Sequence, residues 1–418
     1  MQEVSRYAVG LDVGTTTVRC VVGHVDAAGQ TPTIIGVSEY PNNGMRKGTV
    51  VNLVNAAQAI DKALEIAERM SGHQIHAATV SVNGSHVVGM SSRGVIAVGT
   101  GGHEINEDDL ARVEEAATVV QLPANREILE VTPRSYQLDG QDNIKDPIGM
   151  TGVRLEVDAH VITALGPHLK NLLKACEMTE TVAHRTVLTG LASARAVVSE
   201  RQMENGVVLI DLGGTTTNIA VFDEGDLQHV AVLPVGSVNI TNDLAIGLKT
   251  DLDIAEQVKI QHAVAVPKLR KDNKPVVVKI DKESHEFDPS DVDMIVDARL
   301  EEIFELINKE LKSIGRAAKL PGGAVITGGG AQLRGIEEYA KEALQVSARL
   351  GVPTGYGGVS EKIANPGYSS AVGLMLLDLE GGAGTIDQRK EKSGGVDIGA
   401  MIGSVGNKVT GIFNKFRS

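Results

Sequence analysis

Two similar segments lie about two hundred residues apart in this chain. Residues 10–26 read GLDVGTTTVRCVVGHVD, and residues 207–225 read VVLIDLGGTTTNIAVFDEG. In each segment, apolar residues lead into an aspartate, a glycine-containing turn and three threonines, and apolar residues follow. The β-branched residues on both sides of each turn favour a strand, a tight turn and a return strand. Because the same hairpin occurs twice, the sequence predicts an internally duplicated α/β protein.

The size and composition of the chain predict a multidomain globular protein that does not bind nucleic acid. A chain of 418 residues is too long for one hydrophobic core, so we expect at least two domains. Hydrophobic residues make up 42% and charged residues 22%, which is ordinary for globular proteins. The net charge of −13 argues against binding to nucleic-acid phosphates. Cys20 and Cys176 lie in apolar surroundings without a CxxC pattern, which is typical of reduced core cysteines in a cytosolic protein.

The sequence lacks the patterns of a signal peptide and of a membrane-spanning helix. The first residues, MQEVSRYAVGLDVG, carry an acidic residue at once and lack a long apolar region. The nearest approach to an apolar run, AVGLMLLDL at 371–379, is far shorter than the roughly 18 residues that a spanning helix needs. We therefore expect no export, and we expect any contact with a membrane to be peripheral.

The rest of the chain alternates between helical and strand patterns. Segment 85–161 mixes short strands, one helix and many turn residues, and we interpret it as an inserted α+β subdomain. Residues 381–395 are polar and glycine-rich, which is typical of a flexible linker. Apolar residues at helical spacing predict helices, and a lysine-rich segment between two of them predicts β structure. The predicted helices are 53–72, about 107–120, 168–178, 241–248, 251–261, 291–314 and 369–379, and the β segment is 267–281.

The two hairpins have the residues of a phosphate site. A turn rich in glycine and threonine exposes backbone N–H groups and hydroxyls that can surround phosphate oxygens. The aspartate before each turn, Asp12 or Asp211, is a hard oxygen ligand suited to holding Mg²⁺ through water. One such turn could be only a tight hairpin, but two in matching contexts favour a clamp on a triphosphate. The sequence therefore predicts a nucleotide in a cleft between two halves.

A third glycine-rich segment fits the same cleft. In AVITGGGAQLRG, Gly328, Gly329 and Gly330 follow a predicted strand and precede a predicted helix. Glycines let the backbone pass close to a base or ribose, and the N-terminus of a helix favours negative charge. Three glycines alone are weak support, but their position after the two hairpins strengthens the prediction of a nucleotide site.

Together these three motifs resemble those of the superfamily of actin, sugar kinases and chaperone ATPases. Within it, the chain resembles the FtsA family of bacterial cell-division proteins over nearly its whole length. The resemblance rests on segments in matching order and spacing: KGTVVNLVNAAQAIDKALEIAERMSG, ATVSVNGSHV, ILEVTPRSYQLDGQDNIKDPIGMTGVRLEVDAHVIT, GLASARAVVSE, LPVGSVNITNDLA and NPGYSSAVGLMLL. It implies an actin-like fold with two RNase H-like halves around a nucleotide cleft, an inserted α+β subdomain and a C-terminal amphipathic helix.

The resemblance also implies site residues and a domain layout, with ATP and Mg²⁺ as cofactors. The phosphate-binding residues would be Asp12, Gly14, Thr15, Thr16 and Thr17 in the first hairpin and Asp211, Gly213, Gly214, Thr215 and Thr216 in the second. The nucleoside would lie against Glu256, Lys259, Gly328, Gly329 and Gly330. The parts would be subdomain IA (1–84, 162–192 and 359–380), the insertion IC (85–161), IIA (193–240 and 316–358), IIB (241–315), the linker (381–395) and a membrane-targeting helix (396–418).

Two departures from the pattern of the superfamily bear on catalysis. Many hydrolysing relatives carry a Glu or Gln that orients the attacking water, where this chain has Thr189 and Gly190. Asn218 stands where relatives often have an aspartate. We therefore expect ATP binding with at most slow hydrolysis. Glu256 and Lys259, three residues apart on a predicted helix, could also be only a solvent-exposed ion pair.

The tail GVDIGAMIGSVGNKVTGIFNKFRS has the pattern of an amphipathic helix. At 100° per residue its large apolar residues fall within an arc of roughly 120°, and basic residues flank that arc. Such a stripe is typical of a helix that lies on an anionic membrane. Packing against the protein's own core and a glycine-spaced helix pair are the alternatives. The predicted membrane-contacting residues are Ile398, Met401, Ile402, Val405, Lys408, Val409, Ile412, Phe413, Lys415, Phe416 and Arg417.

The family resemblance implies partners as well. It predicts that subdomain IIB binds the C-terminal peptide of the tubulin-like protein FtsZ through Arg299, with Lys268, Arg270, Lys271 and Lys274 either attracting that peptide or forming only a solvated hairpin. It further implies self-association into filaments, contacts with other division proteins, and a location on the cytoplasmic face of the cell membrane at the division site. Two other functions stay open, namely an actin-like adaptor of a pilus or secretion system and a small-molecule phosphotransferase on the same fold.

Overall fold

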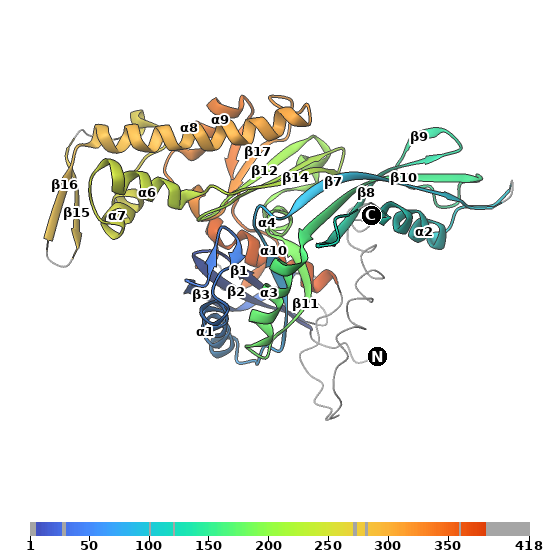
Figure 1. Cartoon of the computed structure of the whole chain (residues 1–418), viewed down its shortest axis with the longest axis horizontal. Helices are drawn as coiled ribbons and strands as arrows, with labels where there is room; N and C mark the ends of the chain where they lie inside the picture. Colours follow the sequence, from blue (N-terminus) through green and yellow to red (C-terminus); the bar gives the residue numbers. More distant parts are fainter. Residues whose placement is uncertain are drawn as a thin grey trace.

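Two sheets of matching topology organise the chain in the computed structural model (Figure 1). The structure describes residues 6–26, 31–99, 102–119, 122–270, 274–280, 283–358 and 361–381. The first sheet has the order β11 (Val182–Leu188), β6 (Ala77–Val82), β1 (Arg6–Val13), β2 (Thr17–Val25), β3 (Thr33–Pro41) and β19 (Gly357–Gly358). The second has the order β14 (Asp226–Leu233), β13 (Thr217–Asp223), β12 (Val207–Leu212), β17 (Gly323–Thr327) and β18 (Ala348–Leu350).

The two sheets repeat one strand pattern. In the first sheet, β1, β2 and β3 are antiparallel neighbours, and β6 and β11 continue parallel to β1 on its other side. In the second sheet, β12, β13 and β14 are antiparallel neighbours, and β17 and β18 continue parallel to β12. Each predicted hairpin is the first pair of strands of its sheet. The duplicated α/β architecture predicted from the two hairpins is therefore confirmed.

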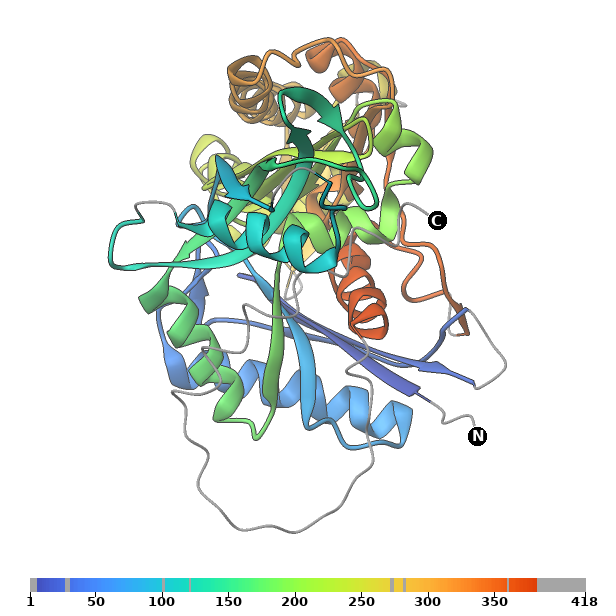
Figure 2. The same ribbon diagram turned by 90° about the vertical axis from the view of Figure 1, so that its right-hand side faces the viewer.

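Helices cover both faces of the first sheet (Figure 2). Helix α1 (Leu53–Ser71) packs on β2 and β3, with α3 (Gly166–Glu177) beside it, and α10 (Ser369–Glu380) packs on the opposite face against β1, β2 and β6. A short ladder of β4 (Met45–Arg46) and β5 (Thr49–Val50) precedes α1. The buried carboxylate of Asp378 ties the end of α10 to this sheet, since it accepts hydrogen bonds from Val9 N at 2.9 Å and Thr79 Oγ1 at 2.7 Å.

The second sheet is buried on both faces because residues of β12 alternate between two hydrophobic clusters. Val207 and Leu209 pack in the cluster shared with the first half, and Val208 and Ile210 pack under the helices of the second half. The elements around this sheet are α4 (Thr189–Val197), α5 (Glu200–Glu204), α6 (Ser237–Gly247), α7 (Leu252–His262), α8 (Pro289–Ser313), α9 (Ile336–Leu344), the 3₁₀ helices η1 (Pro267–Leu269), η2 (Gly329–Gln332) and η3 (Pro366–Tyr368), and the hairpin β15 (Val276–Ile280) and β16 (Glu283–Phe287).

A separate four-stranded sheet forms the inserted part of the chain. Its order is β7 (Val88–Ala97), β10 (Arg154–Leu165), β8 (Arg126–Leu138) and β9 (Gln141–Ile144), and helix α2 (Glu107–Thr118) packs on it. This part has its own hydrophobic core. It extends to one end of the long axis, whereas β15 and β16 project at the other (Figure 1). Lys145 contacts the second half through an ion pair with Asp226.

The predicted helices are confirmed with two differences. Helix α6 begins at Ser237 rather than at 241, because carbonyl oxygens of the second hairpin accept hydrogen bonds from its first N–H groups. After the glycine turn at 328–330 the chain forms the short 3₁₀ helix η2, and the α-helix α9 begins only at Ile336. The expected α-helix N-terminus at the glycines is therefore wrong. The β segment predicted at 267–281 is strand only from Val276, and the predicted tail helix lies outside the described residues.

Both cysteines are free and buried, as predicted. Burial raises the pKa of the Cys176 thiol to about 12. Within the described ranges, no helix is long and apolar enough to cross a membrane.

Candidate functional site

A cleft of about 660 Å³ lies between the two halves and brings together residues from both. It is lined by the two hairpin turns, the start of α6, the end of α7, the glycine turn and the start of α10. Thr215 is the one predicted cleft residue that does not line it, and its hydroxyl is buried without a hydrogen-bond partner. The predicted residues that line the cleft are Asp12, Gly14, Thr15, Thr16, Thr17, Asp211, Gly213, Gly214, Thr216, Glu256, Lys259, Gly328, Gly329 and Gly330.

The first hairpin turn is fixed by the segment that follows β3. Asn42 donates to it twice, from its backbone N to Thr16 O at 2.9 Å and from its Nδ2 to Gly14 O at 2.8 Å. The backbone N of Gly48 donates to Thr15 Oγ1 at 2.9 Å. Because these bonds order the turn before any ligand arrives, its N–H groups need little rearrangement to meet an anion.

The second hairpin turn rests on the N-terminus of α6. Gly213 O accepts from Ser237 N at 2.9 Å, and Gly214 O accepts from Val238 N at 2.7 Å. These bonds satisfy N–H groups that a helix leaves unpaired at its start. Any displacement of this turn by a ligand would therefore be passed directly to α6.

The two turns meet across the cleft. Asn83 at the end of β6 donates from Nδ2 to Thr216 Oγ1 at 3.0 Å, which links the first half to the second hairpin. Gly214 faces Thr16 so closely that a Cβ at this glycine would lie 2.7 Å from Thr16 Cγ2. One polyphosphate in the cleft could therefore contact both turns at once. Sequence reasoning missed Asn83, although it lies within ATVSVNGSHV, one of the segments that carry the family resemblance.

The two aspartates are buried at the base of the turns, with 7% of Asp12 and 5% of Asp211 exposed. Burial raises the pKa of Asp211 to about 6, although a hydrogen bond from Ser193 favours the charged form, and the charge of Asp12 adds to the rise. A divalent cation nearby would stabilise both carboxylates. Among the described residues, no cluster of three or more acidic, His or Cys side chains forms a metal site. Two carboxylates at the base of the hairpin turns fit a cation held largely by phosphate and water, as Mg²⁺ is with nucleotides.

Glu256 and Lys259 form part of the cleft wall. Lys259 Nζ lies 2.7 Å from Glu256 Oε2 and donates to Thr241 Oγ1 at 2.8 Å and to Ser237 O at 3.3 Å. The Lys259 side chain is 12% exposed and that of Glu256 is 40% exposed, so the ion pair is open to solvent mainly on the side of Glu256. The contacts of Lys259 with α6 place its ammonium group on the side of the second hairpin.

The cleft also contains a charged group that sequence reasoning missed. Arg19 of β2 pairs with Glu39 of β3, with 3.1 Å between Nη2 and Oε1. Tyr368 lies below the guanidinium, with its ring centroid 5.3 Å from Arg19 Cζ, and donates from its hydroxyl to Glu39 Oε2 at 3.1 Å. Arg19 Nε is buried and has no hydrogen-bond partner. The sequence could have indicated Arg19, because the pairing of the two strands in the first hairpin places it directly opposite Asp12.

Two of the three positions predicted to weaken hydrolysis lie in the cleft, and Gly190 is not among its lining residues. Thr189 and Asn218 line it, and Thr189 Oγ1 donates to Val82 O at 3.2 Å. Both amide atoms of Asn218 are buried and have no partner. An unpaired buried amide is costly unless water or a ligand satisfies it. Neither side chain is a strong base at neutral pH, which agrees with slow hydrolysis. The hydrolysis rate itself stays a prediction.

Arg299 of α8 is already paired within the protein. It forms an ion pair with Asp243 of α6, with 3.0 Å between Nη2 and Oδ1, and a second with Glu302. The hydrogen bond with Asp243 raises the pKa of Arg299 further. In the neighbouring basic cluster, Arg270 pairs with Asp293. An acidic peptide at Arg299 would therefore have to compete with Asp243.

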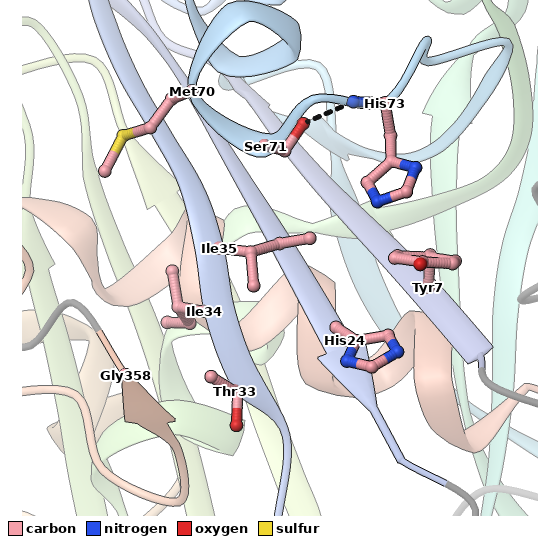
Figure 3. A pocket seen from close by; sticks show the side chains of 9 residues that line it. All are labelled: Tyr7, His24, Thr33, Ile34, Ile35, Met70, Ser71, His73 and Gly358. Carbon is pink, nitrogen blue, oxygen red and sulfur yellow. Dashed lines mark hydrogen bonds between the residues drawn. The ribbon is translucent and has the colours of Figure 1, made fainter.

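A second, shallower pocket of about 520 Å³ lies at the far end of the first sheet (Figure 3). The Tyr7 ring lies between the imidazoles of His24 and His73, at centroid distances of 4.7 Å and 4.2 Å. Ile35 and Met70 lie on the other side of the pocket. It contains none of the predicted site residues, so the cleft between the halves is the candidate functional site.

Solved structures share the fold of this chain. A chain of a PilM–PilN type IV pilus biogenesis complex matches 89% of this chain and 98% of its own length, with a TM-score of 0.65 and 17% identity. MreB5 of Spiroplasma citri bound to ADP matches 90% of this chain and 96% of its own, with a TM-score of 0.54 and 12% identity. At these identities the likeness shows the fold alone. The fold and the cleft define a protein of the actin-like ATPase fold, as predicted.

Sequence comparison then resolves the family within that fold. The family model for cell division protein FtsA matches residues 208–373, and the model for the SHS2 domain inserted in FtsA matches residues 84–163. Cell division protein FtsA of Pseudomonas aeruginosa is 37% identical over 374 residues, which cover 89% of each chain. This chain belongs to the FtsA family of cell-division proteins, and its function is in cell division.

Proposed function

We propose that this chain binds ATP with Mg²⁺ in the cleft and that the nucleotide controls its self-association. The observation that supports this most is the meeting of two phosphate-type turns and the glycine turn at 328–330 in one cleft. Mg²⁺ would be held through water by Asp12 and Asp211 and would offset the charge of the phosphates. Hydrolysis is slow in this proposal because Thr189 and Asn218 offer no carboxylate base.

The rest of the chain attaches the division ring to the membrane in this proposal. The halves correspond to subdomains IA, IIA and IIB, and the inserted sheet corresponds to IC. Residues 396–418 lie on anionic lipid at the cytoplasmic face of the cell membrane, with about 1 kcal/mol from each basic residue. Because one such helix binds reversibly, a filament that presents many of them gains avidity. Subdomain IIB binds the C-terminal peptide of FtsZ, with Arg299 exchanging Asp243 for a carboxylate of that peptide.

Co-sedimentation with anionic liposomes tests the proposal. The full chain is compared with a truncation at Gly395, each with and without ATP and Mg²⁺. A matched pair of charge substitutions isolates the apolar stripe: Ile402→Asp places a carboxylate inside it, and Asn407→Asp places one on the opposite face of the helix. We expect the full chain and Asn407→Asp to pellet with liposomes, more so with ATP and Mg²⁺. The truncation and Ile402→Asp should stay in the supernatant.

Two results would count against the proposal. Pelleting that survives the truncation would mean that the tail is not the anchor. Equal pelleting with and without ATP and Mg²⁺ would remove the link between nucleotide and membrane. Binding of the FtsZ C-terminal peptide is then measured on Arg299→Glu against Arg316→Glu, a second arginine near the end of α8 that pairs with Asp223. We expect only the first variant to lose affinity.

A further inference from the structure

Helices α4 and α10 pack against each other, and the pattern Gly-x-x-Ser-Ala occurs at or just before the start of each. Residues 190–194 of α4 read GLASA, and residues 367–371, which run from η3 into α10, read GYSSA. Helix α4 follows β11 of the first sheet but packs on β12 and β13 of the second. Helix α10 comes after β18 of the second sheet and the short β19 of the first, and it packs on β1 of the first sheet. The chain therefore passes from the first sheet to the second at α4 and returns to the first sheet through β19 and α10.

In both helices the serine of this sequence is bonded to the aspartate at the base of a hairpin. Ser193 of α4 donates from Oγ to Asp211 Oδ2 at 2.5 Å. Ser370 of α10 donates from Oγ to Asp12 Oδ2 at 2.6 Å. Both serines are buried, with 0% and 4% of each residue exposed. A serine in a helix more often bonds to a carbonyl of its own helix. Here both serine hydroxyls donate to an aspartate of a hairpin instead.

The glycine of each segment faces the residue that pairs with the aspartate across the hairpin. Gly190 faces Asn218, since a Cβ there would lie 3.1 Å from Asn218 Cβ, and Asn218 is the strand partner of Asp211. Gly367 faces Arg19, since a Cβ there would lie 3.6 Å from Arg19 Cζ, and Arg19 is the strand partner of Asp12. The same arrangement therefore occurs twice: a helix serine bonds the aspartate, and a glycine three residues earlier faces the residue paired with that aspartate across the hairpin. Two unrelated packing accidents would not repeat four positions.

We propose that Ser193 and Ser370 are paired positioning residues for the carboxylates that organise Mg²⁺. The inference rests on the proposed nucleotide function of the cleft. Each serine donates to Oδ2, so the aspartate is oriented before Mg²⁺ arrives. Groups that orient a metal-organising side chain commonly change metal affinity by about 10-fold to 100-fold when removed.

The test measures how much Mg²⁺ tightens nucleotide binding to the full chain. Affinity for a fluorescent ATP analogue is measured in excess Mg²⁺ and in EDTA. For Ser193→Ala and Ser370→Ala we expect the Mg²⁺-dependent gain in affinity to fall about tenfold, which equals about 1.4 kcal/mol. Affinity in EDTA should change by less than about twofold, because the serines act through the aspartates that organise Mg²⁺.

A matched control lies next to Ser370. Ser369 is also buried at the start of α10, but its hydroxyl is 2.6 Å from Thr327 Oγ1 instead of an aspartate. Ser369→Ala should keep the full Mg²⁺-dependent gain. If an alanine variant fails to fold by circular dichroism, the cysteine variant at the same position keeps a weak donor of similar size and should lose only part of the gain.

The outcomes separate this inference from the function on which it rests. If the unmodified chain binds no nucleotide in either buffer, the proposed function is wrong. If it binds nucleotide but shows no gain with Mg²⁺, or if the serine variants keep the whole gain, the positioning role is wrong. Equal losses of affinity in both buffers would point to a general packing defect and would also overturn the positioning role.

Discussion

Replacing Gly373 by alanine is predicted to force the crossing helices α4 and α10 apart. An alanine Cβ at this position would lie 1.7 Å from the carbonyl oxygen of Ala192, whereas real Cβ contacts stay above 3.0 Å. Because the obstacle is backbone, no side-chain rotation relieves it, and the helices must separate by roughly 1 Å or more. Overpacking costs about 1–3 kcal/mol, with this contact at the upper end. Alanine returns about 1 kcal/mol of helix propensity, so we expect a net loss of about 2 kcal/mol.

Urea unfolding followed by far-UV circular dichroism measures this loss, since the chain contains no tryptophan to report by fluorescence. The two helices join the halves, so the loss should appear in the first transition if the halves unfold separately. Gly357→Ala is the control, because a Cβ at Gly357 meets no atom within 4 Å, and its stability should stay within about 0.5 kcal/mol of the unmodified chain. A Gly373→Ala protein as stable as this control would refute the close crossing of α4 and α10.

Two further predictions concern the cleft and the inserted subdomain. Asn218→Asp places a carboxylate in the cleft, so ATP hydrolysis, measured by phosphate release, should rise about tenfold or more; an unchanged rate would contradict the reason given for slow hydrolysis. Burial, with the charges of Arg134 and His229 nearby, lowers the pKa of His160 to about 3. Since unfolded histidine binds its proton near pH 6.5, the free energy of unfolding should fall as pH drops below about 6.5, by up to about 1.4 kcal/mol per pH unit. In His160→Leu, urea unfolding at about pH 7 and about pH 5 should show a smaller fall, and an equal fall would rule out His160 as its source.

Much of the fold could be predicted because its signals are local. The hairpins were visible from apolar runs around a Gly-Thr turn, and α1, α8 and α10 from helical spacing of apolar residues. The start of α6 was misplaced because its first N–H groups are satisfied by Gly213 O and Gly214 O, which lie more than twenty residues earlier. The α-helix expected at the glycine turn was misplaced because a positive φ at Gly328 leads into a 3₁₀ turn instead. Both errors lie at element ends, where local pattern is weakest.

The sequence by itself determined that this chain is a duplicated α/β protein with phosphate-type turns, because turn chemistry and apolar periodicity depend on neighbours a few residues apart. Only the tertiary structure decided which side chains complete the cleft. Asn83 reaches Thr216 across the halves, Ser193 and Ser370 hold the aspartates, and Arg299 is occupied by Asp243. These contacts join residues from 18 to 358 positions apart. They depend on how the two sheets pack together with helices α4 and α10, and no local propensity encodes that arrangement.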